Sequence, residues 1–349
     1  MATTKKLWQR LGLQLPVIQA PMYNVSTPAL VAAVAAEGAL GSYGAGYSAP
    51  DKLRAALTEI TAMVPGKNFN VNVFVDSPSV PESSRGWDSY ERLLAPVREE
   101  LGLDPTPQPY PTTAIPSVLD AQLQVILDIR PRVVSFCFGV LDPAMVRACQ
   151  EFATVLGTAT TVEEALALEA AGVDGIIAQG SEAGGHRGSF LADSTSTMIG
   201  SMALIPQICD AVRVPVIAAG GIADRRHMRA ALALGADMVQ LGTAFLTTPE
   251  SDLPPARKRA IVAATSSTAS IVTRGLTGRP ARMLRNELVA ALQPHEADAA
   301  SSVLQRRRMA DIFRLHDPRF SAMLAGQSHR FCTDGDSVKA VLARFHESA

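Results

Sequence analysis

The sequence predicts an α/β fold, a (β/α)8 TIM barrel that carries an inserted segment and a C-terminal helical cap domain. Three observations lead to this prediction. Short apolar runs alternate with amphipathic segments rich in Ala and Leu, the alternation makes eight units, and two regions depart from it. Such alternation is typical of a parallel sheet with helical crossovers. Eight units favour closure into a barrel over an open, doubly wound sheet, and 349 residues suit one barrel with an appendage.

Each unit begins with a short apolar strand, as expected where a strand is buried on both faces. The predicted strands cover residues 16–20, 39–42, 69–75, 132–138, 154–159, 173–179, 216–219 and 238–242. The predicted helices cover residues 28–37, 50–63, 143–152, 161–171, 199–212, 224–234 and 255–264.

Two regions depart from this alternation. Residues 76–116 are rich in proline, show little periodicity and are too long for an ordinary βα loop, so we expect an insertion. Residues 266–349 look helical and carry charge-rich stretches. We therefore predict a barrel formed by residues 1–75 and 117–265, and a helical second domain, formed by the two departing regions, that caps the site.

Charge and composition disfavour several classes of partner. The formal net charge is -1, and no basic stripe with interleaved aromatic residues is present, so we do not expect nucleic-acid binding. Arg306, Arg307 and Arg308 form the one tight cationic run, which we expect on the solvated face of a helix. No apolar h-region follows the lysines near the N-terminus, and no apolar run approaches the ~20 residues that span a bilayer. We expect a cytoplasmic protein, monomeric or homodimeric, without membrane contact.

The four cysteines are widely spaced, with neither a CxxC pair nor the spacing of a zinc finger. Reduced thiols are the expected state, and no metal site is predicted.

Polar and glycine residues gather at the carboxyl ends of the predicted strands. In a barrel of this kind the ligand site lies on the face where the strands end. The residues at these ends are Ala20, Pro21 and Met22; Asn72; Ser135, Phe136 and Phe138; Gln179 and the loop 180–188; Ala219, Gly220 and Gly221; and Gly242 and Thr243. We expect the site to be built from these residues.

The loops after the seventh and eighth strands suit a phosphate group. At Gly220 and Gly221 the backbone can approach an anion closely, because no Cβ obstructs the approach. The next helix would direct the positive end of its dipole at that anion. Gly242 and Thr243 add a second pair of N–H groups and a hydroxyl. The alternative is that these glycines only make tight turns, but their presence in two adjacent units favours phosphate.

His186 lies just past the sixth strand, within Gly184-Gly185-His186-Arg187-Gly188. Flanking glycines indicate an unusual backbone close to a ligand, and histidine supplies a donor, an acceptor or a base near neutral pH. The other five histidines lack such a context, so His186 alone is the candidate catalytic residue.

A competing pattern occupies residues 44–49, which fit G-x-G-x-x-A, a form of the dinucleotide fingerprint. The acidic residue that this fingerprint requires would be Asp76, much further along than the usual ~20 residues. An ordinary loop before a helix explains the pattern equally well.

Together these stretches resemble the class I nitronate monooxygenases, formerly called 2-nitropropane dioxygenases. The likeness extends over nearly the entire chain and is most specific in residues 179–188 and 215–224. The segments that carry it are 19–22, 135–139, 179–188, 215–224, 240–246, 273–275, 278–282 and 325–327.

The resemblance implies an FMN-bound barrel that oxidises alkyl nitronates, such as propionate 3-nitronate, with O₂. The products would be a carbonyl compound and nitrite, formed through an anionic flavin semiquinone. It implies that FMN contacts Ala20, Pro21, Met22, Asn72, Gln179, Gly184, Gly185, Ala219, Gly220, Gly221, Gln240, Leu241, Gly242 and Thr243. It also implies that His186 lies over the flavin as a base or a nitronate partner.

The predicted substrate pocket contains Tyr23, Ser135, Cys137, Phe138 and Arg187. Arg187 would hold the anionic substrate or flavin; a structural pairing with a carboxylate is an equally good interpretation. Two of these residues depart from the family pattern, which often has His in place of Cys137 and a small residue in place of Tyr23. Substrate preference therefore does not follow from the resemblance.

Three other functions remain open at this stage. The first is an NAD(P)H-dependent FMN reductase on the same barrel, acting on enoyl-acyl-carrier or quinone substrates. Those enzymes resemble Gly-Gly-His-Ile-Gly or Ala-Gly-His-Pro in this loop, whereas this chain has Gly-Gly-His-Arg-Gly. The second is a non-enzymatic barrel that binds a phosphorylated ligand. The third is an NAD-dependent dehydrogenase on an open sheet, suggested by residues 44–49 alone.

Overall fold

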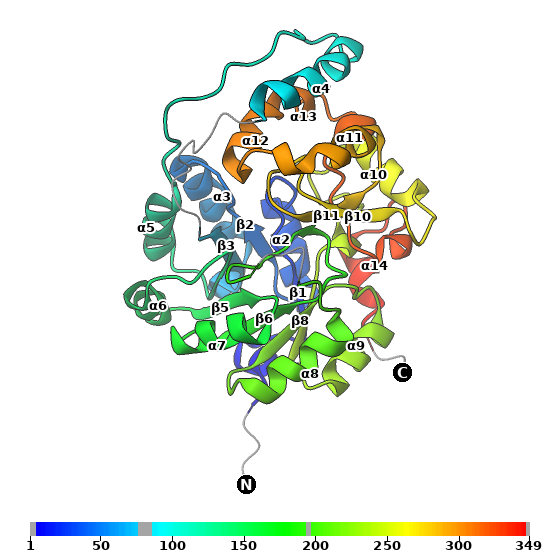
Figure 1. Ribbon diagram of the computed structural model, residues 1–349. Coiled ribbons are helices and arrows are strands. Elements are labelled where there is room, and N and C mark those ends of the chain that lie inside the picture. The colour runs from blue at the N-terminus through cyan, green and yellow to red at the C-terminus, as the bar shows by residue number, and fades with distance from the viewer. Residues whose placement is uncertain (1–4, 76–85, 193–196, 347–349) are drawn as a thin grey trace.

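The computed structural model describes residues 5–75, 86–192 and 197–346, and Figure 1 shows the chain as a ribbon. Within these ranges eight parallel strands form one sheet, in the order β1-β9-β8-β6-β5-β4-β3-β2. The strands are β1 Val17–Gln19, β2 Ser42–Gly44, β3 Asn70–Phe74, β4 Val133–Cys137, β5 Thr154–Ala159, β6 Gly175–Gln179, β8 Val216–Ala219 and β9 Met238–Leu241. All eight predicted strands are therefore present, although β2 begins a few residues later than expected.

The first and last strands of this order meet and close the sheet. Ile18 of β1 pairs in parallel with Leu40, just before β2. The Leu40 N–H donates to the Val17 carbonyl (3.0 Å), and the Leu40 carbonyl accepts from the Gln19 N–H (2.9 Å). The predicted barrel is confirmed, and the open sheet required by the dehydrogenase alternative is absent from the described residues.

Helices surround the barrel and continue beyond it. Several begin at residues whose side chains cap the helix, such as Thr27 and Thr161. The helices are α1 Leu7–Arg10, α2 Pro28–Ala36, α3 Pro50–Met63, α4 Trp87–Glu100, α5 Leu119–Ile129, α6 Pro143–Gln150, α7 Val162–Ala170, α8 Ser201–Ala211, α9 Arg225–Ala233, α10 Pro255–Ala263, α11 Glu287–Leu292, α12 Ser302–Arg308, α13 Ala310–Phe313 and α14 Val338–Ala343. In the described part of the chain, no helix combines the length and apolar character needed to cross a bilayer.

The interior of the barrel is filled at the amino ends of the strands. Ile18, Ile177 and Ile217 point inward and pack against Leu7 and Leu11 of the short N-terminal segment around α1. This segment seals the amino end of the barrel with apolar side chains. Ligand space is therefore left at the opposite end, where the strands finish.

The eighth barrel helix is not the predicted one. Residues 255–264 were expected to follow the last strand around the wall, but α10 packs through Ile261 against Leu253 and Met323 outside it. The wall beside β1 and β9 is instead covered by α14, whose Val341 and Leu342 belong to a core shared with the barrel strands. Helix α14 therefore covers this part of the barrel, although residues 266–349 were predicted to belong to the cap.

A second core joins α4 to residues 276–320. Tyr90 and Leu94 of α4 are buried against Leu288 and Ile312, among others. Figure 1 shows α4, α11, α12 and α13 gathered at one end of the molecule, beyond the strands. The predicted packing of the insertion beside the C-terminal region is present, while the division into domains remains a prediction.

The region after residue 265 is only partly helical. Strands β10 Ser270–Thr273 and β11 Ala281–Leu284 pair antiparallel, and β11 also pairs with β7, the two residues Gly185–His186. The C-terminal region therefore contains a small sheet beside its predicted helices, and this sheet links it directly to the loop that carries His186.

The arginine run 306–308 does not lie on a solvated helix face. Arg308 is fully buried, with its guanidinium 3.6 Å from the Trp87 ring centroid and 3.2 Å from a carboxylate oxygen of Glu91. Glu91 also pairs with the buried Arg98 (2.7 Å). Of the three arginines, Arg307 alone is exposed, and Arg306 faces a cavity.

Candidate active site

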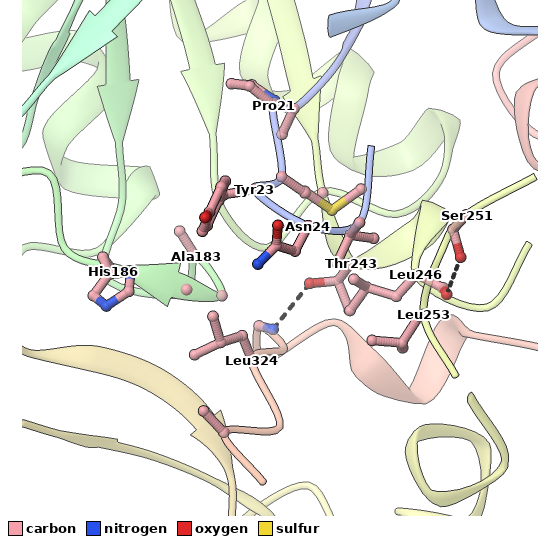
Figure 2. A pocket seen from close by; sticks show the side chains of 18 of the residues that line it. Pro21, Tyr23, Asn24, Ala183, His186, Thr243, Leu246, Ser251, Leu253 and Leu324 are labelled. Carbon is pink, nitrogen blue, oxygen red and sulfur yellow. Dashed lines mark hydrogen bonds between the residues drawn. The ribbon is translucent and has the colours of Figure 1, made fainter. Parts of the chain in front are cut away.

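A cavity of about 1030 Å³ opens at the carboxyl ends of the barrel strands. This volume is at the upper end of the range for small-molecule sites, enough for a cofactor together with a substrate. Most of the predicted site residues line it: Ala20, Pro21, Met22, Tyr23, Asn72, Cys137, Phe138, Gln179, Gly184, Gly185, His186, Ala219, Gly220, Gly221, Gln240, Leu241, Gly242 and Thr243. Figure 2 shows His186 on one side of this lining, Ser251 and Leu253 on the other, and Tyr23, Asn24 and Thr243 between them.

Two predicted pocket residues do not reach the cavity. Ser135 is fully buried behind Asn72, and its hydroxyl accepts from the Asn72 amide (2.9 Å). Arg187 turns away and donates to backbone carbonyls, including those of Thr160 (3.4 Å) and Thr197 (3.3 Å). Burial lowers the pKa of Arg187 to about 10. Both side chains therefore lie behind the residues that line the cavity and do not form part of its surface.

The loop that carries His186 is held on both sides. Its backbone pairs with Ala281 of β11 on the cap side. On the barrel side the Gln179 amide donates to the His186 carbonyl (3.1 Å) and accepts from the Gly188 N–H (2.8 Å). Gly185 has φ +79°, a conformation that favours glycine. The side chain of Gln179 therefore positions this loop, although the residue also lines the cavity.

The imidazole of His186 is neutral near neutral pH. Burial, followed by the charges of Arg279 and Arg306, lowers its pKa to about 4. Its Nε2 atom is buried and has no hydrogen-bond partner in the part of the chain that is described. A neutral ring with an uncommitted nitrogen can accept a proton or form a hydrogen bond with a ligand in the cavity.

The glycine loops after β8 and β9 present unpaired amides. Gly220 and Gly221 have φ +105° and +74°, and a Cβ on Gly220 would lie 3.0 Å from the Ala183 nitrogen. The N–H groups of Gly221, Gly242 and Thr243 have no hydrogen-bond acceptor within the described ranges. Such a group of amides is suited to an anion such as phosphate.

Gly326 and Gln327, in the C-terminal part of the chain, close the cavity beside the glycine loops. The Gly326 N–H donates to the Thr243 hydroxyl (2.9 Å), the bond drawn beside Thr243 in Figure 2. The Gln327 N–H donates to the Glu182 carbonyl (3.0 Å). The segment therefore joins the loop after β9 to the loop after β6.

The helix after β8, α9, is less suited to bind an anion at its N-terminus than the sequence predicted. Asp224 caps α9 and accepts from the Arg226 N–H (2.9 Å). Hydrogen bonding from Arg226 lowers the pKa of Asp224 to about 2, so the carboxylate is ionised there. This negative charge already lies at the helix N-terminus, so it disfavours a second anion there.

Tyr47, Phe74 and Arg306 also line the cavity, and none of the three was predicted as a site residue. Tyr47 lies three residues after the end of β2, so the rule that located the other residues near strand ends also indicates it. It lies inside the 44–49 pattern. There, a Cβ on Gly46 would lie 2.4 Å from the Tyr23 ring, so this glycine serves close packing and not a dinucleotide. Arg306 comes from the cap, where no strand end marks it.

Comparison with known proteins gives consistent matches over nearly the whole chain. The sequence model of a family described as nitronate monooxygenase matches residues 4–347. A relative described as a probable nitronate monooxygenase, from Staphylococcus aureus (strain MRSA252), is 36% identical over 339 residues, covering 95% of this chain and 94% of its own. Among solved structures, nitroalkane oxidase from Streptomyces ansochromogenes has a TM-score of 0.84 at 37% identity, with 95% of each chain covered. FabK from Thermotoga maritima has a TM-score of 0.74 at 28% identity, covering 98% of this chain and 96% of its own.

Proposed function

Since the chain belongs to the nitronate monooxygenase family, a family of flavin-dependent oxidoreductases, we propose that it binds FMN and oxidises alkyl nitronates of the propionate 3-nitronate type with O₂. The products of this reaction are a carbonyl compound and nitrite. The observation that carries the proposal is the neutral, glycine-framed imidazole of His186, which faces the same cavity as two loops with unpaired amides.

The polar groups of the cavity fit FMN. The unpaired N–H groups of Gly221, Gly242 and Thr243 suit its phosphate. The Gln240 side-chain oxygen lines the cavity, is buried and lacks a donor among the described residues. The ring N–H of a flavin is a donor of the kind that this oxygen needs. When bound, the flavin supplies the redox chemistry, taking electrons from the nitronate and passing them to O₂.

His186 is the residue proposed to bind the substrate or to accept its proton. Near neutral pH its neutral ring can take a proton from the α-carbon of a nitroalkane or donate a hydrogen bond to a nitronate oxygen, depending on the tautomer. The charges of Arg279 and Arg306 reach His186, so they also favour an anion bound beside it. The Phe138 ring lies edge to face with the imidazole, with 6.2 Å between the ring centroids, and lines the cavity beside it.

Oxygen uptake and nitrite release, measured on the purified flavin-bound protein, test this function. We expect propionate 3-nitronate to support both, with nitrite formed in step with oxygen consumption. A parallel assay with the carbon-protonated 3-nitropropionate asks whether neutral nitro groups are also accepted. A flavin-loaded protein that consumes no oxygen with any nitronate would exclude the proposed reaction.

A further inference from the structure

The guanidinium of Arg306 lines the cavity, and the proposed reaction does not by itself assign it a role. It lies on α12 of the cap, half-buried, with its guanidinium carbon 4.9 Å from the Tyr23 ring centroid and 4.6 Å from that of Tyr47. One of its nitrogens is 3.5 Å from the Tyr23 hydroxyl. Two aromatic faces therefore fix where this cation sits.

The surroundings of Arg306 differ from those of the buried arginines of the same cap. Arg98 pairs with the carboxylates of Glu91 and Asp311, and Arg308 pairs with Glu91. Arg306 makes no ion pair with a carboxylate in the described part of the chain, and the cavity runs beside it. A partly desolvated cation of this kind is best stabilised by an anion that enters the cavity.

Arg306 and His186 belong to the same electrostatic environment, because the charge of Arg306 contributes to the low pKa of His186. Arg279 contributes as well, but its guanidinium lies 4.1 Å from the Phe138 ring centroid and it is not part of the cavity lining. Of these two cations, Arg306 is therefore the one that a ligand beside His186 can reach.

The position of Arg306 is braced from the barrel side. The Tyr47 hydroxyl lies 3.2 Å from that of Ser302, at the start of α12. Tyr47 also packs edge to face on Phe74, with 5.3 Å between ring centroids. The aromatic wall and the helix that carries Arg306 are thus held together, which preorganises the cation for binding.

We propose that Arg306 is a specificity-determining residue that binds a carboxylate carried by the nitronate substrate. This inference rests on the proposed function. The nitronate group lies at His186 and the second anionic group at Arg306, so the enzyme favours nitronates that bear a carboxylate over nitronates of equal chain length without one.

Steady-state kinetics of the holoenzyme with two substrates tests this role. Propionate 3-nitronate and propyl 1-nitronate share a three-carbon chain and differ in the carboxylate. We expect Arg306→Gln to lower kcat/KM for propionate 3-nitronate by roughly 10- to 100-fold, the usual effect of losing a hydrogen bond to a charged group. The value for propyl 1-nitronate should change by less than about threefold. Arg307→Gln is the matched control, since Arg307 is exposed and lies one residue further along α12.

An equal loss with both nitronates, or no loss with either, would overturn the assignment of Arg306. A binding measurement keeps this test independent of turnover. In anaerobic calorimetric titrations, the wild-type protein should bind 3-nitropropionate more tightly than 1-nitropropane, and Arg306→Gln should abolish that preference. If the wild-type protein oxidises neither nitronate, the proposed function fails, while the titration still decides whether Arg306 selects a carboxylate. A preference that survives in Arg306→Gln contradicts the inference.

Discussion

Replacing His186 with Asn is expected to lower kcat/KM for a nitroalkane or nitronate by about 10²- to 10⁴-fold, the usual worth of a general acid or base, while the protein keeps its flavin. Asn fills similar space but cannot take up a proton. The pKa of His186 is about 4, so the wild-type ring carries no charge at neutral pH. The loss will therefore reflect the imidazole itself and not the removal of a positive charge.

Flavin absorbance and steady-state kinetics measure the effect of this substitution. His295→Asn is the matched control, because His295 is exposed and does not line the cavity. If His186→Asn retains wild-type kinetics, His186 only supports the loop. If it loses the flavin, the residue contributes to cofactor binding and its catalytic role is unproven.

Replacing Gly242 with Val should weaken FMN binding roughly 10- to 100-fold, the effect expected from overfilling a packed site, and should yield a largely colourless protein. Gly242 has φ -108°, which other residues adopt. A Cβ there would lie 3.5 Å from the Ala20 Cβ and 3.9 Å from the Met22 sulfur, both ordinary contacts. The fold should therefore accept the new side chain, whose Cβ would lie beside Ala20 and Met22 of the cavity lining, where FMN is proposed to bind.

Equilibrium titration with FMN, together with thermal unfolding of the flavin-free proteins, separates cofactor loss from misfolding. Gly102→Asn serves as the control, because Gly102 has φ +68° and open space around it, and asparagine tolerates this conformation. A Gly242→Val protein that binds FMN as tightly as the wild type would remove the loop after β9 from the cofactor site.

The barrel and most of its site follow from the sequence for physical reasons. Parallel strands covered on both faces must be apolar throughout, so they are visible as short apolar runs. Their carboxyl ends meet on one face, so residues as distant in sequence as Met22 and Thr243 can be assigned to one cavity.

The position of a residue near a strand end does not by itself predict whether its side chain faces the cavity. His186 and Arg187 are neighbours in an extended segment, where successive side chains point to opposite faces. His186 therefore faces the cavity, while Arg187 points into the wall. Asn72 and Ser135 pair across two neighbouring strands, and their mutual hydrogen bond leaves only Asn72 at the surface of the cavity.

The cap was harder to predict because several of its charged side chains are buried, whereas charged side chains usually lie at the surface. Helix α4 buries Glu91 and Arg98 alongside Tyr90 and Leu94, so its inward face does not read as apolar, and Pro96 interrupts the expected helical composition. Glu91 pairs with Arg98 on the same helix, but its second cation, Arg308, lies more than two hundred residues away in the sequence. Pairing at that distance has no local signature, and the same holds for Arg306 at the cavity.

Anaerobic mixing of the flavin-bound protein with propionate 3-nitronate and, separately, with NADH distinguishes nitronate oxidation from a reductase reaction. The proposed function predicts that propionate 3-nitronate bleaches the flavin absorbance faster than NADH does. Faster bleaching by NADH would contradict nitronate oxidation and would assign the protein to a reductase reaction on the same barrel.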